Sequence, residues 1–189
     1  VVSDEDTPNF KFISELNILL PEMSDIGAIR PSMAPLEGVG KRQSTDFGDK
    51  KFEPGIEGIK HFGLNGNYIS GAIYNKELLT DLGFHKRLEK NLAEQWTYPH
   101  LYMNILAASS TKTCFMSGVS CFEGEPVDIK PCQTDYFGAF SYGSRIDQFV
   151  ALRNAILEGV LECDGDFDSE GFYNVYTHLS RKYVKLVSF

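Results

Sequence analysis

The chain has 189 residues, 42% of them hydrophobic, which is enough to bury one sizeable core without requiring a second domain. Its formal charge of −8 at pH 7 disfavours nucleic acid as a partner, because nucleic-acid-binding proteins usually present a basic face to the phosphates. No segment approaches the roughly 20 apolar residues that span a bilayer, and residues 1–10 carry acids instead of the basic and apolar regions of a signal peptide.

The cysteines show no C-x-x-C spacing, so the sequence encodes neither a zinc knuckle nor a thioredoxin motif. A chain of this length does not need disulfides to be stable, and no feature indicates export. We therefore expect a cytoplasmic protein with reduced thiols at Cys114, Cys121, Cys132 and Cys163.

The first elements are predicted to be a strand end, a helix and a second strand. The chain opens with two valines typical of the end of a buried strand, which predicts that further sequence precedes them. A helix follows, N-capped by Asn9 and ended by Pro21, with apolar residues at helical spacing: Phe12, Leu16, Leu19 and Leu20. Residues 26–29 predict a short strand. Residues 31–58 predict a long surface loop, either a flap over a substrate or a disordered insertion.

The middle of the chain predicts two strands and two helices. Residues 68–74 predict a strand, after which Asn75 caps a short helix that Gly83 closes. A second helix begins near Pro99, because proline fits the first helical turn. Its apolar face contains Leu101, Ile105 and Ala108. Residues 113–122 then predict another strand.

Two amphipathic helices are predicted at the end, one from Ser144 and one from Ser169. The apolar stripe predicted for the first contains Ile146, Phe149, Val150, Ile156, Leu157 and Val160. The elements together predict an α/β domain with a mixed sheet in residues 1–142, followed by a helical extension in residues 143–189.

The acidic segment Ser-Asp-Glu-Asp at residues 3–6 is a candidate metal site. In an extended backbone alternate side chains share a face, so Asp4 and Asp6 can point at the same ion. Carboxylate oxygens suit Mg²⁺ or Mn²⁺, which bridge to a substrate diphosphate. The alternative is that the acids only cap the following helix and complement its dipole, and the spacing alone favours that alternative.

The candidate general base is His100 in the first turn of a predicted helix. The positive end of a helix disfavours imidazolium, and a neutral imidazole can accept a proton from a sugar hydroxyl. Glu94 is a rival base. The alternatives are a partly buried structural histidine and an ordinary solvated carboxylate.

Ser70 and Gly71 are candidates for contact with a ligand, because glycine lets the backbone approach closely. Tyr68 and Tyr98 offer faces on which a sugar ring can stack. The alternative interpretation is that Gly71 only forms a bulge in a strand and that the tyrosines belong to the core.

The chain contains no P-loop, no G-x-G-x-x-G, no H-E-x-x-H and no Ser-His-Asp arrangement of a serine protease, so hydrolase and dinucleotide-binding interpretations lack their usual motifs.

The order of these segments resembles the later half of the family-two, inverting GT-A glycosyltransferases, notably bacterial enzymes that build polysaccharides. Residues 3–6 are similar to the D-x-D motif at a strand end. Residues 68–78 are similar to the segment beside the donor diphosphate, and residues 98–102 to the helix that starts near the catalytic base. The resemblance covers about the first two thirds of the chain.

The resemblance implies a mixed-sheet, Rossmann-like GT-A fold with additional C-terminal helices. It implies transfer of a sugar from a nucleotide-sugar donor to a glycan or lipid-linked acceptor, with peripheral membrane contact left open. Asp4 and Asp6 would hold Mn²⁺ or Mg²⁺. Ser70 and Gly71 would lie beside the diphosphate, and His100 or Glu94 would deprotonate the acceptor.

Two departures from the family pattern stand out. The family base is the Asp of a Glu-Asp pair, whereas Pro99 and His100 stand at the corresponding place. The opening half of the family domain, which binds the nucleotide base and ribose, has no counterpart in this sequence. A non-catalytic domain that binds a glycan or a protein is therefore the main alternative, and a hydrolase with paired carboxylates is a third.

Overall fold

The structure is a computed structural model that describes residues 6–35, 48–65, 70–83, 85–87, 89, 99–124, 142–164 and 169–187. Short strands and turns alternate with helices along the chain, and the two longest helices come last. The elements in order are β1 (Thr7–Pro8), α1 (Phe10–Leu19), a 3₁₀ helix (Leu20–Met23), β2 (Ile26–Pro35), β3 (Lys50–Phe52), α2 (Ile56–Gly58), a π-helical turn (Ile59–Gly63), β4 (Ile73–Tyr74), α3 (Lys76–Asp81), α5 (Pro99–Ser110), β5 (Lys112–Glu123), α7 (Tyr142–Asp164) and α8 (Ser169–Val187).

The sheet is open and mixed, with strand order β1-β5-β2-β4 and β3 added beside β5. β2 and β5 are parallel and pair along most of their length, from Ile26 opposite Lys112 to Pro35 opposite Glu123. β1, β3 and β4 pair antiparallel with these two long strands. The predicted α/β class with a mixed sheet is therefore confirmed.

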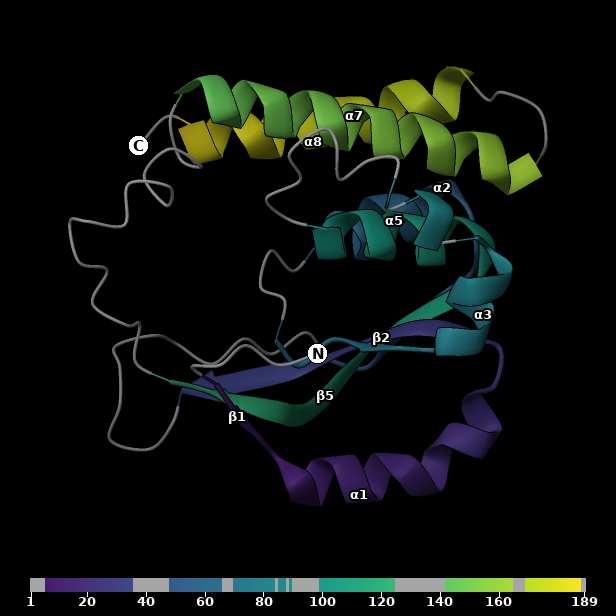
Figure 1. The fold of residues 1–189 in the computed structure, drawn as a ribbon, viewed down its shortest axis with the longest axis vertical. Helices are drawn as coiled ribbons and strands as arrows, with labels where there is room; N and C mark the ends of the chain where they lie inside the picture. The colour runs from purple at the N-terminus through teal and green to yellow at the C-terminus, as the bar shows by residue number, and fades with distance from the viewer. Residues whose placement is uncertain are drawn as a thin grey trace.

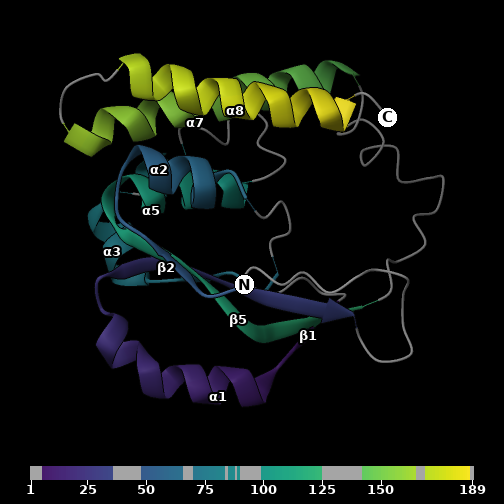
Figure 2. The same cartoon turned by 180° about the vertical axis from the view of Figure 1, so that it is seen from behind.

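Helices cover both faces of the sheet (Figure 1). α1 lies on one face and α2 and α5 lie on the other, while α7 and α8 form a further layer over α5; the reverse view shows the same order (Figure 2). α5 is therefore enclosed on two sides, and its Tyr102 and Ile105 are fully buried. The larger core joins the sheet, α5, α7 and α8, and a smaller one joins the sheet to α1.

Local capping signals are confirmed. Asn9 caps α1 by accepting a hydrogen bond from the backbone N of Phe12 at 3.3 Å. Asn75 caps α3 in the same way, accepting from the backbone N of Glu77 at 3.1 Å and of Leu78 at 3.3 Å. α5, β5 and α8 lie where the sequence predicts them. Cys114, Cys121 and Cys163 are free thiols, and Cys132 lies outside the described residues.

The loop predicted for residues 31–58 is wrong over the part that the structure describes. β2 continues to Pro35, because it pairs with β5 over this whole stretch. Pro31 is tolerated because the register shifts directly after it, at a bulge. β3 and α2 also fall within the predicted loop, and residues 36–47 lie outside the described part. Of the strand predicted for residues 68–74, the structure describes residues 70–74, which form a strand at Ile73–Tyr74 and a turn at Ser70 and Gly71.

The apolar stripe predicted for α7 is wrong in part. Ile156 and Val160 are buried, whereas Ile146, Val150 and Leu157 are exposed. The absence of a side chain at Gly159 allows the buried face to lie there: a Cβ added at Gly159 would lie 2.9 Å from Cγ2 of Ile105, so α7 approaches α5 closely at this point.

The helices of residues 143–189 share the larger core with α5, and the division of the chain near residue 142 stays a prediction. None of the helices in the described ranges has the length and hydropathy needed to cross a membrane.

Candidate functional site

The carboxyl ends of the parallel strands β2 and β5 lie side by side at one edge of the sheet, at Pro35 and Glu123. α5 runs back over the sheet: Thr111, directly after the helix, packs where a Cβ on Gly27 would stand, near the start of β2. The first turn of α5 therefore lies toward the carboxyl edge. In open α/β sheets ligands bind at this edge.

Four of the predicted site residues fall in the described part of the chain and four do not. The described ones are Asp6, Ser70, Gly71 and His100. Asp4, Tyr68, Glu94 and Tyr98 lie outside it, so their predicted roles stay predictions.

Asp6 is buried directly before β1, which pairs with the end of β5. Its Oδ1 accepts a hydrogen bond from the backbone N of Gly124 at 3.1 Å. Burial raises the pKa of the neighbouring Cys121 thiol to about 11, and the charge of Asp6 adds to that effect. The carboxylate of Asp6 is therefore fixed beside the last residues of β5, next to a thiol that is protonated at neutral pH.

The turn at Ser70 and Gly71 lies against the same stretch of β5. The carbonyl oxygen of Gly71 accepts a hydrogen bond from Oγ of Ser120 at 3.2 Å. Gly71 has φ +77°, and a Cβ there would lie 2.4 Å from that Oγ and 3.2 Å from Sγ of Cys121. Only glycine fits this position, because the turn packs closely against β5. The predicted close approach of Gly71 to a ligand stays a prediction. Ser70 is fully buried beside it.

His100 lies in the first turn of α5 and is 4% exposed, which is more buried than the partly buried histidine considered from the sequence. Asn104, one helical turn later on the same face, accepts a hydrogen bond from the Tyr74 hydroxyl at 2.9 Å. Tyr74 belongs to β4, so this face of α5 points at the sheet. His100 is thereby placed on the sheet side of the helix.

Sequence reasoning missed Arg30 in β2, which is only 2% exposed. Among the described residues, no acceptor lies within hydrogen-bond distance of its Nε or Nη1. Burial lowers the pKa of Arg30, an effect that Tyr74 and Cys121 oppose. Burial also raises the pKa of Tyr74 to about 12, against the influence of the Arg30 charge. The available signal was a lone cation within the apolar segment of residues 26–34.

The chain matches no protein family, no curated protein and no solved structure. The side chains at this edge of the sheet are therefore the basis for assigning a function.

The described residues fit a divalent metal site in part. Asp6 supplies one hard oxygen ligand at the carboxyl edge, and its predicted partner Asp4 lies outside the described residues. Within the described ranges, no group of three or more His, Cys, Asp or Glu residues is placed to hold a metal ion. A Mg²⁺ or Mn²⁺ ion that bridges a diphosphate keeps several waters and takes only one or two carboxylates from the protein.

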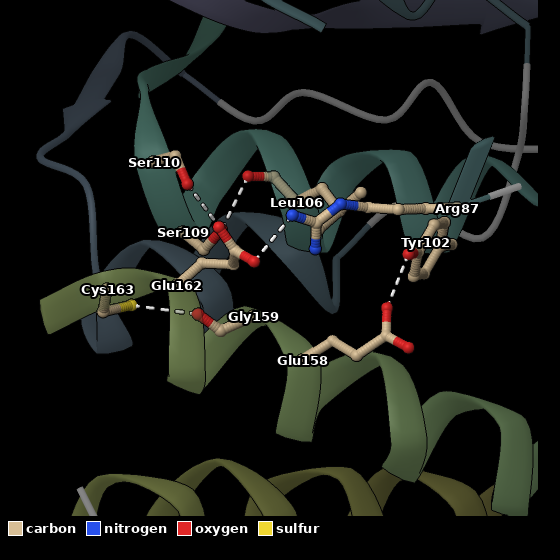
Figure 3. A network of polar contacts seen from close by, with 9 residues as sticks. All are labelled: Arg87, Tyr102, Leu106, Ser109, Ser110, Glu158, Gly159, Glu162 and Cys163. Carbon is tan, nitrogen blue, oxygen red and sulfur yellow. Dashed lines mark hydrogen bonds and ion pairs between the residues drawn. The ribbon is translucent and has the colours of Figure 1, made fainter. Parts of the chain in front are cut away.

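A second polar cluster lies on the far side of α5, between α5 and α7 (Figure 3). The Tyr102 hydroxyl donates to Oε2 of Glu158 at 2.6 Å, and Nη2 of Arg87 pairs with Oε1 of Glu162 at 2.6 Å. Burial alone would lower the pKa of Arg87, but the contact with Glu162 outweighs it and the pKa is raised. Tyr102 pairs with Glu158 across the α5–α7 interface and Arg87 pairs with Glu162 of α7, as buried or half-buried polar groups in a structural network do.

Proposed function

We propose that this protein is a glycosyltransferase that moves a sugar from a nucleotide-sugar donor to a hydroxyl of a glycan or lipid-linked acceptor, with inversion. One observation carries the proposal: Asp6 and the Ser70–Gly71 turn both lie against the last residues of β5, at the carboxyl edge of the two parallel strands. A carboxylate and a glycine-containing turn at the carboxyl edge of parallel strands suit a metal-bound diphosphate. The GT-A form of the mixed sheet belongs to the same proposal.

Each candidate residue would have its own role in the transfer of the sugar. Asp6 and Asp4 would hold Mn²⁺ or Mg²⁺, which when bound neutralises negative charge on the departing nucleoside diphosphate. Gly71, which has no Cβ, and Ser70 would lie beside that diphosphate. The acceptor oxygen would form a bond to the anomeric carbon while the bond from that carbon to the diphosphate oxygen breaks. The hydroxyl proton would pass to His100 or Glu94.

Titration calorimetry of the full-length protein with uridine and thymidine diphosphate sugars, with and without Mn²⁺, tests the proposal. We expect donor affinity that depends on the metal and that falls at least about tenfold in Asp6→Asn. Asparagine retains an Oδ1 acceptor for the Gly124 backbone N, so the substitution removes the charge and leaves that hydrogen bond possible.

Asp49→Asn is the matched control, because Asp49 is an exposed carboxylate whose Oδ1 accepts from the backbone N of Ser117 at 2.9 Å. It should bind donor as the wild type does. Donor affinity that is equal with and without Mn²⁺, or equal in Asp6→Asn, contradicts the proposal. Binding of free glycans without metal would instead support the non-catalytic binding domain.

A further inference from the structure

Arg30 occupies the centre of the sheet and points toward α5. Its strand β2 is paired on one side with β5 and on the other with β4. In the parallel register Arg30 lies opposite Phe115, and Ala28, two residues earlier on the same face, lies opposite Thr113. Ala28 and Phe115 both belong to the larger core beneath α5. The guanidinium therefore lies in the layer between the sheet and the helix.

This guanidinium lacks an acceptor in the described part of the chain, at both Nε and Nη1. Arginine remains protonated in proteins, and a buried charge without a partner is strongly unfavourable. The two groups that act electrostatically on Arg30 are Tyr74 and Cys121, and both are protonated at neutral pH because burial raises the pKa of Tyr74 to about 12 and that of Cys121 to about 11. Arg87, in contrast, has a carboxylate of Glu162 at 2.6 Å.

The first turns of α5 add a second influence on the same side of the sheet. Asn104 connects α5 to Tyr74, whose phenol acts electrostatically on Arg30. His100 lies one turn nearer the start of the helix, on that same sheet-facing side. The N-terminal end of a helix carries partial positive charge and favours anions. The helix end and the guanidinium therefore both favour negative charge in this layer.

We propose that Arg30 anchors a binding site for an oxyanion, the phosphate or carboxylate group of a small ligand, between the sheet and the first turns of α5. Guanidinium N–H groups match both kinds of oxyanion in geometry and charge. The site does not depend on glycosyl transfer, since a non-catalytic domain with the same buried arginine would bind the same chemical group.

Thermal unfolding of the full chain in inorganic phosphate, pyrophosphate or acetate, at one ionic strength set with NaCl and with EDTA throughout, tests the site. At a concentration about 100-fold above Kd, the binding anion should raise the wild-type Tm by about 5–10 °C. A response to phosphate or pyrophosphate alone identifies a phosphate ligand, and a response to acetate alone identifies a carboxylate. EDTA removes divalent metal, so failure of the proposed Asp6 metal site does not affect this result.

Substitutions of Arg30 test whether the anion-dependent rise in Tm depends on its guanidinium. In Arg30→Met the anion-dependent rise should disappear, while the anion-free Tm should equal or exceed that of wild type because a buried charge without acceptors at Nε and Nη1 is removed. Arg30→Lys keeps the charge and should retain a smaller rise. Arg153→Met removes an exposed arginine on α7 and should respond like wild type.

Three results would overturn the proposal. The first is the absence of any anion-dependent rise in wild type, and the second is an equal rise in Arg30→Met. The third is loss of folding, or a clearly lower anion-free Tm, in both Arg30 variants, because the guanidinium would then be satisfied within the chain itself.

Discussion

The surroundings of α5 have two halves that differ in chemistry, one on the side of α7 and one on the side of the sheet. On the α7 side the contact is apolar where Ile105 and Ile59 meet Gly159. On the sheet side lie Arg30 and the Tyr74 to Asn104 hydrogen bond. Apolar burial stabilises a fold, whereas an unpaired buried cation opposes folding. The comparison indicates that the first half stabilises the structure, and the second half is the one in which we propose a ligand site.

The largest expected effect comes from the apolar half. Ile105→Ala should lower the free energy of unfolding by about 2–5 kcal/mol, because it opens a cavity where α5 meets α7 at Gly159. Urea denaturation measures this loss. Leu157→Ala, at a partly exposed position on α7, should change it by about 0.5 kcal/mol or less. Equal losses in the two variants would remove the contrast between this core and the surface.

The next effect concerns the turn at the carboxyl edge. Gly71→Ala should destabilise the protein by about 2–4 kcal/mol, since it combines a positive φ with a clash against Ser120. Gly83→Ala is the matched control: Gly83 has φ +67° but no atom within 4 Å of an added Cβ. It should lose only about 1 kcal/mol from backbone strain. If thermal unfolding gives the same loss for both, β5 does not constrain the turn as described.

The smallest expected effect is a pH dependence in the polar half. Burial raises the pKa of Tyr74 from 10.0 to about 12. Between these values the unfolded chain releases the proton and the folded chain keeps it, so the free energy of unfolding falls as pH rises. The contribution of Tyr74 to this fall is about 2–3 kcal/mol.

Urea denaturation at pH 9 and at pH 12 measures that contribution as the difference between wild type and Tyr74→Phe. The variant should lose less stability than wild type over this interval. Tyr173→Phe, at an exposed position on α8, should behave as wild type. Parallel behaviour of Tyr74→Phe and wild type would show that the Tyr74 hydroxyl is not held away from water.

Signals that act within a few residues were predictable from the sequence. The caps at Asn9 and Asn75 and the start of α5 follow from local hydrogen bonds and backbone preferences. The length of β2 was not predictable, because its partner strand is distant in sequence: Ser32 donates to the carbonyl of Met116, 84 residues away. The face of α7 that becomes buried likewise depends on Gly159 meeting Ile105.

The candidate site divides in the same way. Asp6, Gly71 and His100 could be selected because their residue types suit the chemistry in short motifs. Arg30 could not, because its burial depends on the pairing of β2 with β5, a strand that is distant in the sequence. The Tyr74 to Asn104 contact joins β4 to α5, and no local pattern encodes it.

The most direct test of a catalytic carboxyl edge is sugar transfer by the full-length protein with Mn²⁺, compared between wild type and Asp6→Asn while thermal unfolding is followed in both. We expect Asp6→Asn to lose metal-dependent transfer at a nearly unchanged Tm, with Asp49→Asn fully active. Transfer at the wild-type rate in Asp6→Asn, or wild-type transfer that persists in EDTA, would contradict a metal role for this carboxylate.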